Sequence, residues 1–135
     1  MIRFEALALV IAKMNGGFDE PDSRAFKLRN PGLLKTYRPE KKTDSEHYRV
    51  FTSFMGGFKA LTADLQIKCS GKNHRLSPDN TLRDMLVLFG LGNEQVIRKI
   101  VLFLRRALLD ESVGAATKLG WFQETEEIKE AEVNG

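Results

Sequence analysis

An apolar segment near the start of the chain, residues 2–14, constrains the fold more than any other feature. Apolar side chains recur there at helical spacing, and further apolar residues fill the gaps between them. A helix that is apolar nearly all round has to be buried. Gly16 and Gly17 follow and provide a stop signal. The sequence therefore predicts a central buried N-terminal helix that ends beside Asn15.

The overall composition is that of an ordinary globular domain. The chain has 135 residues, of which 42% are hydrophobic and 29% are charged. No apolar run approaches the roughly 20 residues that span a bilayer. Glu5 interrupts the first apolar segment and no small-residue cleavage site follows it, which argues against a signal peptide. One cysteine and two widely spaced histidines predict neither an internal disulfide nor a metal site, and no cofactor is expected.

The next part of the chain is predicted to be a loop followed by a small β-hairpin. Residues 15–32 are dense in Gly, Pro, Asp, Ser and Asn, which favours a loop. Its last three residues, Asn-Pro-Gly, indicate a turn in which proline sets φ and glycine is free to take a positive φ. Residues 33–37 and 48–52 are short runs with β propensity, and a strongly polar stretch joins them. We therefore expect a hairpin with a long polar tip.

The second half of the chain is predicted to be helical. Helices are expected at about 57–68, after a glycine pair, at 81–89 and at 94–109. Thr81 and Asp84 form a candidate capping pair, and Asn93 is a candidate N-cap. A short helix or turn is expected within 112–122. The sequence thus predicts one mainly helical α+β domain over residues 1–123.

The charges are distributed unevenly along the chain. Residues 124–135 contain five glutamates and one lysine, a charge of −4, and subtracting this from the net charge of +3 leaves +7 on the remainder. This acidic tail has no large apolar face, so we expect it to be disordered. The basic remainder either attracts an anionic polymer such as nucleic acid or simply keeps the protein in solution.

The order of these motifs resembles the lysozyme-like superfamily, in particular small bacterial and phage lysozyme-like (transglycosylase-like) domains. In those families an apolar helix ends in Glu-Gly-aromatic, and an Asn-Asn-Pro-Gly-Asn turn, a hairpin and a Gly-x-x-Ala-Leu helix follow. The corresponding segments here are Asn15-Gly-Gly-Phe18, Arg29-Asn-Pro-Gly-Leu33 and Gly57-Phe-Lys-Ala-Leu61. The resemblance covers about residues 5–110. It implies a lysozyme-like fold with four to five further helices, and peptidoglycan or a related glycan as the partner.

The departures from the family pattern bear on catalysis. The residue that closes the first helix in those families is the glutamate that protonates the glycosidic oxygen, and Asn15 stands in its place. An amide neither gives nor takes a proton near neutral pH. Loss of general acid catalysis alone costs about 10²–10⁴-fold in rate. Arg29 and Leu33 also replace asparagines of the family turn. These departures imply a degenerate enzyme that binds glycan strands or is catalytically silent.

Two other hypotheses remain open. One is an active peptidoglycan hydrolase or lytic transglycosylase that uses a non-standard carboxylate. Asp19 and Glu20 are the first candidates because they follow Asn15 in the next loop, and Asp22, Asp44 and Glu46 are further ones. Alternatively, all five are solvated loop carboxylates. The other hypothesis is a basic phage structural or nucleic-acid-binding module. Without a signal peptide, a cytoplasmic or phage-associated location is expected.

Four further residues are candidates for substrate binding. Asn30 either caps its own turn or offers an amide to a sugar. Tyr37, His47 and Tyr48 either form a wall for sugar rings or pack across the predicted hairpin. The sequence alone does not decide between these roles.

Overall fold

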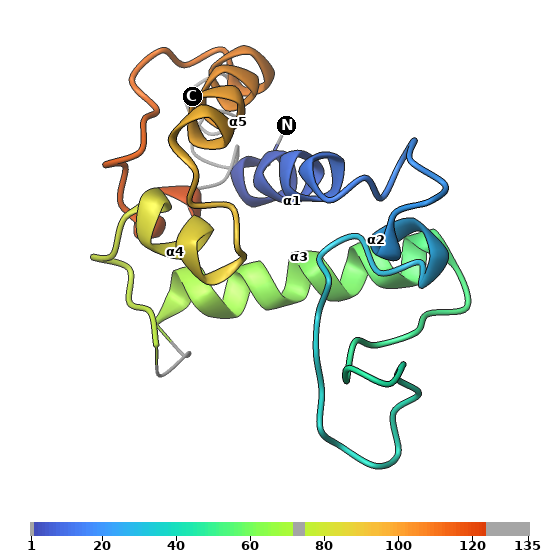
Figure 1. The fold of residues 1–135 in the computed structure, drawn as a ribbon. Helices are drawn as coiled ribbons and strands as arrows, with labels where there is room; N and C mark the ends of the chain where they lie inside the picture. Colours follow the sequence, from blue (N-terminus) through green and yellow to red (C-terminus); the bar gives the residue numbers. More distant parts are fainter. Residues whose placement is uncertain (1, 72–74, 124–135) are drawn as a thin grey trace, which may run out of the picture. The chain divides into compact units, whose positions relative to one another are not determined.

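The computed structural model describes residues 2–71 and 75–123, and this part of the chain is mainly helical (Figure 1). The only β pairing in it consists of isolated bridges. In chain order, the elements are five α-helices and one 3₁₀ helix: α1 (Arg3–Met14), α2 (Arg24–Lys27), α3 (Phe54–Ser70), α4 (Leu82–Leu88), α5 (Glu94–Leu108) and η1 (Leu119–Gln123).

The chain divides into two compact units. The central unit comprises Ala8–Asp64, and the terminal unit comprises Met1–Leu7 together with Leu65–Gly135. The boundaries fall inside α1 and α3, so each unit contains part of both helices. No described helix is both long and apolar enough to cross a membrane.

Helix α1 matches its prediction to within one residue. Its apolar side chains surround the helix axis, and most of them are fully buried. The chain then leaves the helix through Gly16, whose φ of +79° is the left-handed conformation that glycine adopts without steric cost. The fully buried residues of the helix are Ala6, Leu7, Ala8, Val10, Ile11 and Ala12.

The predicted hairpin is not formed as two strands. Lys35 pairs with Tyr48 and Thr43 pairs with Arg49, each through a single antiparallel bridge. The segment around Tyr48 and Arg49 thus has a pairing partner on either side, but no ladder extends beyond one bridge. His47, at a φ of +69°, turns the chain immediately before the bridged residues, which limits the pairing.

The loop between α1 and the bridged segments contains a helix that the sequence pattern did not predict. Helix α2 has only four residues, too few to show a 3.6-residue period. It is fixed by its cap, because the Ser23 hydroxyl oxygen accepts a hydrogen bond from the backbone N–H of Phe26.

Helix α3 begins at Phe54, three residues before its predicted start, and its glycines serve close packing. A Cβ at Gly57 would clash with the carbonyl of Arg29 and lie 2.8 Å from Pro31 Cδ. A Cβ at Gly32 would lie 2.5 Å from Leu61 Cδ1. Gly32 does not use the positive φ that the turn pattern left open to it, and a glycine is needed there because of this close approach to α3.

The left-handed residues of that turn are instead the two that flank it. Arg29 has a φ of 51° and Leu33 a φ of 50°. Neither residue is a glycine or an asparagine, the types that tolerate this conformation best. The exposed Arg29 side chain donates from Nη1 to the Thr52 carbonyl at 2.5 Å, which links the turn to the segment before α3.

The terminal unit contains the helices with the clearest sequence signals. The Thr81–Asp84 capping box and the Asn93 N-cap are both present, as predicted. The short helix or turn expected within 112–122 corresponds to η1, which begins at Leu119. Thr81 forms a β bridge with Lys118. The acidic tail, residues 124–135, lies outside the described residues. The core side chains of this unit include Leu82, Met85, Leu86, Ile97, Ile100, Leu104, Leu119 and Phe122.

We predict that Arg29→Asn is more stable than Arg29→Ala by about 1 kcal/mol, because both variants lose the bond to Thr52 and only asparagine tolerates the left-handed backbone well. Lys27, exposed in α2, is the control. At position 27 we expect the reverse order of stability: Lys27→Ala is more stable than Lys27→Asn because alanine has the higher helix propensity. Urea unfolding of the four variants measures both differences, and the same order at both positions would contradict the assignment.

Candidate functional site

All the site residues predicted from sequence lie in the central unit, so their geometry can be compared directly. They fall into three groups: the end of α1 with the loop that follows it, the Asn-Pro-Gly turn, and the bridged segments that replace the hairpin. The residues are Asn15, Asp19, Glu20, Asn30, Tyr37, His47 and Tyr48.

Asn15 joins the first two groups. It directly follows α1 and is half-buried. Its Nδ2 donates a hydrogen bond to the carbonyl oxygen of Pro31 at 3.0 Å. Gly17, two residues later, packs so closely on Pro31 that a Cβ there would lie 3.1 Å from Pro31 Cα. The end of the first helix and the Asn-Pro-Gly turn are therefore in direct contact.

Asp19 and Glu20 lie in the exposed loop after Asn15. The Glu20 backbone N–H donates to the Gly16 carbonyl at 3.2 Å, and the Glu20 carboxylate lies over Gly16, where it would clash with any Cβ. Ser23 donates from its hydroxyl to the same carbonyl at 3.0 Å. Glu20 is thus held beside the backbone of Gly16, the residue that follows Asn15.

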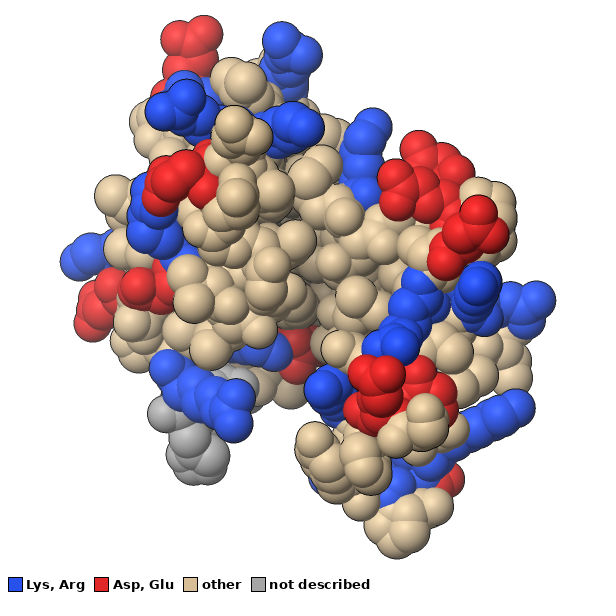
Figure 2. Space-filling model, viewed as in Figure 1, with Lys and Arg blue, Asp and Glu red and all other residues tan. Residues whose placement is uncertain are grey.

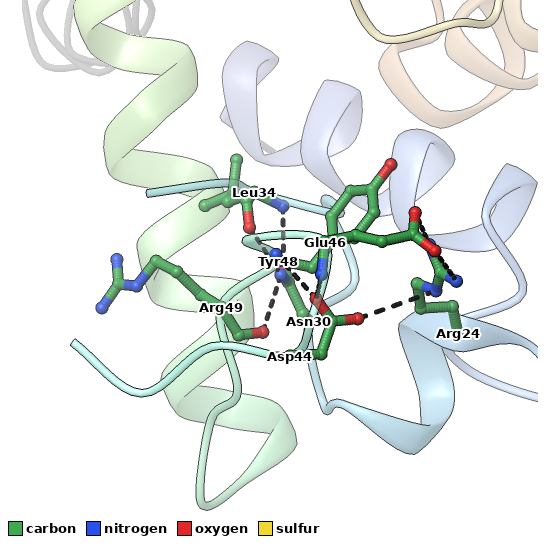
Figure 3. A network of polar contacts seen from close by, with 7 residues as sticks. All are labelled: Arg24, Asn30, Leu34, Asp44, Glu46, Tyr48 and Arg49. Atoms are coloured by element: carbon green, nitrogen blue, oxygen red, sulfur yellow. Dashed lines mark hydrogen bonds and ion pairs between the residues drawn. The ribbon is translucent and has the colours of Figure 1, made fainter. Parts of the chain in front are cut away.

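Asn30 is a fully buried polar residue. Its Nδ2 donates to the carbonyls of Leu34 at 2.9 Å and Arg49 at 3.0 Å, and its Oδ1 accepts from the Leu34 N–H at 2.9 Å (Figure 3). These three bonds use both amide hydrogens and the amide oxygen on backbone partners. The contacts therefore describe a structural residue inside the protein, and the amide does not face a substrate.

Asp44 and Glu46 are also engaged with the protein itself. Arg24 donates to both oxygens of Glu46, at 2.8 and 2.9 Å, and this hydrogen-bonded ion pair lowers the pKa of Glu46. Asp44 Oδ1 accepts from the N–H groups of Glu46 and Tyr48, at 2.9 and 3.0 Å (Figure 3). Both carboxylates thus act as acceptors that order the loop, and Glu46 is held in its ionised form.

The aromatic candidates separate into an exposed pair and a half-buried ring. The rings of Tyr37 and His47 lie 4.4 Å apart between centroids, and Tyr37 is 74% exposed. Tyr48 is half-buried, with the Arg24 guanidinium 5.0 Å and the Lys35 ammonium 4.6 Å from its ring centre. We call Tyr37 and His47 the exposed ring pair. It presents π surface to solvent and does not complete a hydrophobic core.

The backbone holds His47 in the orientation that makes this pair. Its N–H donates to the Asp44 carbonyl at 3.2 Å, and its own carbonyl accepts from the Thr36 N–H at 3.0 Å. Histidine is among the residues enriched in the left-handed conformation that His47 occupies. The backbone conformation of His47 is thus fixed by hydrogen bonds within the loop.

Sequence reasoning missed Arg24, which contacts three other residues of the site. It pairs with Glu46, lies 3.8 Å from Asp44 and approaches the Tyr48 ring. The partners are about twenty residues away in the chain, and no local spacing signals such a contact. An arginine next to a serine N-cap was the only available clue, and it indicates a helix start rather than a site.

The remaining reactive groups do not extend the site. The described residues contain no group of three or more His, Cys, Asp or Glu side chains that suits a metal ion. Cys69 lies in the terminal unit, and burial raises the pKa of its thiol to about 11. It is therefore protonated at neutral pH and is a poor nucleophile.

The surface charges are mixed. On the face shown in Figure 2, lysine and arginine side chains lie beside aspartates and glutamates in several places.

Comparisons of the chain with protein-family models, with curated proteins and with solved structures found no match. The function therefore has to be argued from the residues and their geometry.

We predict that Asn30→Ala lowers the free energy of unfolding by roughly 2–4 kcal/mol, because three buried hydrogen bonds are lost at about 0.5–1.5 kcal/mol each. Asn30→Asp keeps the size but turns a carboxyl oxygen toward two carbonyls, which raises the pKa of the new group in the folded state. Its protonated form is then the compatible one, so this variant is least destabilised below pH ~4 and loses stability as the pH rises.

The matched control is Asn93→Asp. Asn93 only accepts hydrogen bonds, from the N–H groups of Gln95 and Val96, so aspartate serves equally well there. Chemical denaturation between pH 3 and pH 8 measures both variants. An Asn30→Asp variant as stable as Asn93→Asp at neutral pH would contradict the buried amide role.

Proposed function

We propose that this chain is a degenerate relative of the peptidoglycan-cleaving glycosidases, with a lysozyme-like α+β fold, which binds glycan strands at its central unit without cleaving them. The observation that carries the proposal is the hydrogen bond from Asn15 to Pro31. It joins the two motifs on which the resemblance depends, the helix end and the Asn-Pro-Gly turn. In the family pattern, the helix-end position belongs to the catalytic acid.

The backbone of the turn supports the same proposal. Arg29 and Leu33 stand where the family has asparagines, and both are left-handed. Asparagine is the non-glycine residue best suited to that conformation. The turn therefore has a backbone that suits the family residues, even though the side chains have changed.

The carboxylates of the central unit support a silent rather than an active site. A glycosidase acid needs a partly apolar environment that keeps it protonated. The hydrogen-bonded pairing with Arg24 lowers the pKa of Glu46, and Asp44 accepts two backbone hydrogen bonds. Asp19 and Glu20 are exposed. None of these four has the environment of a general acid.

One observation favours the active alternative. The Glu20 carboxylate lies over Gly16, immediately after Asn15 and the end of α1. An active hydrolase or lytic transglycosylase would use Glu20 as its acid, provided that a bound glycan removed it from solvent. Activity measurements on Glu20→Gln distinguish this candidate from the silent one.

The exposed ring pair is the feature best suited to a glycan. Tyr37 offers a solvent-facing ring to the apolar face of a sugar, and Lys35 and Arg24 lie close by at Tyr48 with hydrogen-bond donors for hydroxyl groups. Binding sites of this kind combine aromatic surface with a few polar groups. Asn30 contributes only by holding the segment in place.

We predict that the protein co-sediments with purified cell walls, and that Tyr37→Ala weakens this binding by about 0.5–1.5 kcal/mol, the value of one aromatic contact. Phe26→Ala is the matched control because Phe26 is also an exposed aromatic residue of the central unit but lies outside the ring pair. Equal loss in both variants, or no wall binding by the wild-type chain, would count against glycan recognition at this site.

We also predict that the wild-type chain does not clear a cell-wall suspension, whereas Asn15→Glu gains slow turnover. The new carboxyl would face the Pro31 carbonyl, which repels an ionised oxygen and accepts a bond from a protonated one, so its pKa is raised. Asn15→Gln has a side chain as long as that of Asn15→Glu but without an acidic proton, so it should stay inactive. Robust wild-type turnover that Glu20→Gln abolishes would replace the silent-site proposal with the active one.

A further inference from the structure

Helix α5 carries an outward face that the fold leaves uncovered in the described structure. Lys99, Leu102, Phe103, Arg106 and Ala107 line a hollow of about 540 Å³. Their spacing of i, i+3, i+4, i+7 and i+8 puts all five on one side of a single helix. We call this set the α5 face. Its residues belong to the terminal unit, and none of them is part of the glycan site proposed above.

The α5 face combines three apolar side chains with two cations, one toward each end of the face. Ile97, Ile100 and Leu104 of the same helix are buried, so the core is built on the opposite side. Leu102, however, is 51% exposed. Within residues 2–71 and 75–123, neither Lys99 nor Arg106, which lie two helical turns apart, forms an ion pair. Exposed apolar side chains rimmed by one sign of charge are typical of a protein-binding surface.

We propose that the α5 face binds an acidic amphipathic helix of a partner protein. A helix laid along α5 would place apolar side chains, spaced i, i+3, i+4 and i+7, on Leu102, Phe103 and Ala107. Glutamates about two turns apart on the partner helix would then meet Lys99 and Arg106, which lie one at each end of the face.

A second copy of this chain fits the α5 face poorly. An antiparallel pairing centred between Leu102 and Phe103 brings Lys99 of one copy beside Arg106 of the other. A parallel pairing brings each cation beside its own equivalent. Both arrangements place like charges together, which opposes association.

Extended anionic surfaces also fit less well than a short peptide. The described lining of the hollow has two cations, Lys99 and Arg106, and three apolar residues. A nucleic-acid backbone would leave the apolar side chains without a partner, and two cations are fewer than the about four to eight that bind an anionic membrane. A peptide with carboxylates opposite Lys99 and Arg106 uses both the cations and the apolar residues.

The test is fluorescence anisotropy of the full chain with a labelled amphipathic peptide that has leucines at i, i+3, i+4 and i+7 and glutamates beside them. We expect Lys99→Glu and Arg106→Glu each to weaken binding about tenfold or more. Arg98→Glu makes the same charge change on an exposed neighbour outside the hollow and should change binding less than about twofold.

An uncharged pair of variants separates packing from charge. Leu102→Ala should weaken binding, whereas Leu109→Ala should not, because Leu109 is 92% exposed and lies outside the hollow. The proposal would be overturned if Arg98→Glu weakened peptide binding as much as Lys99→Glu does. Equal binding of a peptide with lysines in place of the glutamates would also overturn it. Tighter binding of anionic vesicles than of the peptide would assign the face to lipid instead.

The chain's own acidic tail is the remaining alternative occupant. In the full chain, the five glutamates between 124 and 135 are replaced by glutamines. Peptide affinity that stays within about twofold of the wild-type value supports a separate partner. Affinity that rises about tenfold would show that the tail already competes for the α5 face, and would overturn the proposal of a separate partner. Cell-wall binding, measured in parallel, tests the glycan proposal independently.

Discussion

The hydrogen bonds of the buried Asn30 side chain organise the central unit. They join the Asn-Pro-Gly turn to Leu34 and to Arg49, which lie on neighbouring bridged segments. Each bridged pair there has only one β bridge, so the backbone alone provides little pairing. One amide thus supplies contacts that a longer β ladder would otherwise make. A buried polar group is costly unless it is fully paired, and full pairing makes this arrangement specific.

The charged contacts around Asn30 act differently. The Arg24–Glu46 pair is exposed and lies at the loop surface, where an ion pair contributes little to stability. The ion pair restricts the conformation of the loop, because Arg24 also approaches Asp44 and the Tyr48 ring. The amide therefore holds the segment together, while the ion pair orients the residues next to the exposed ring pair.

The sequence predicted those elements whose causes are local. The apolar run of α1, the Thr81–Asp84 box and the Asn93 cap each act within a few residues, and all three are present. The hairpin was mispredicted partly for a local reason, the positive φ of His47, which the sequence does not signal. The remaining causes are distant: the Arg49 carbonyl is nineteen residues from Asn30, and Leu61, which packs on Gly32, is farther along the chain than any turn pattern extends. Composition indicated a loop over residues 15–32 but not the long-range hydrogen bonds that Asn30 makes from it.

Under the proposal of a degenerate glycosidase, Asn15 occupies a catalytic position that has become a structural one. A glutamate acid beside the Pro31 carbonyl is unfavourable when ionised, and that same unfavourable contact would keep it protonated for catalysis. An amide in its place donates a hydrogen bond to that carbonyl at every pH. The change removes the proton and replaces an electrostatic conflict with a favourable bond. Stability and catalysis thus make opposite demands on this one position, and asparagine satisfies the demand of stability.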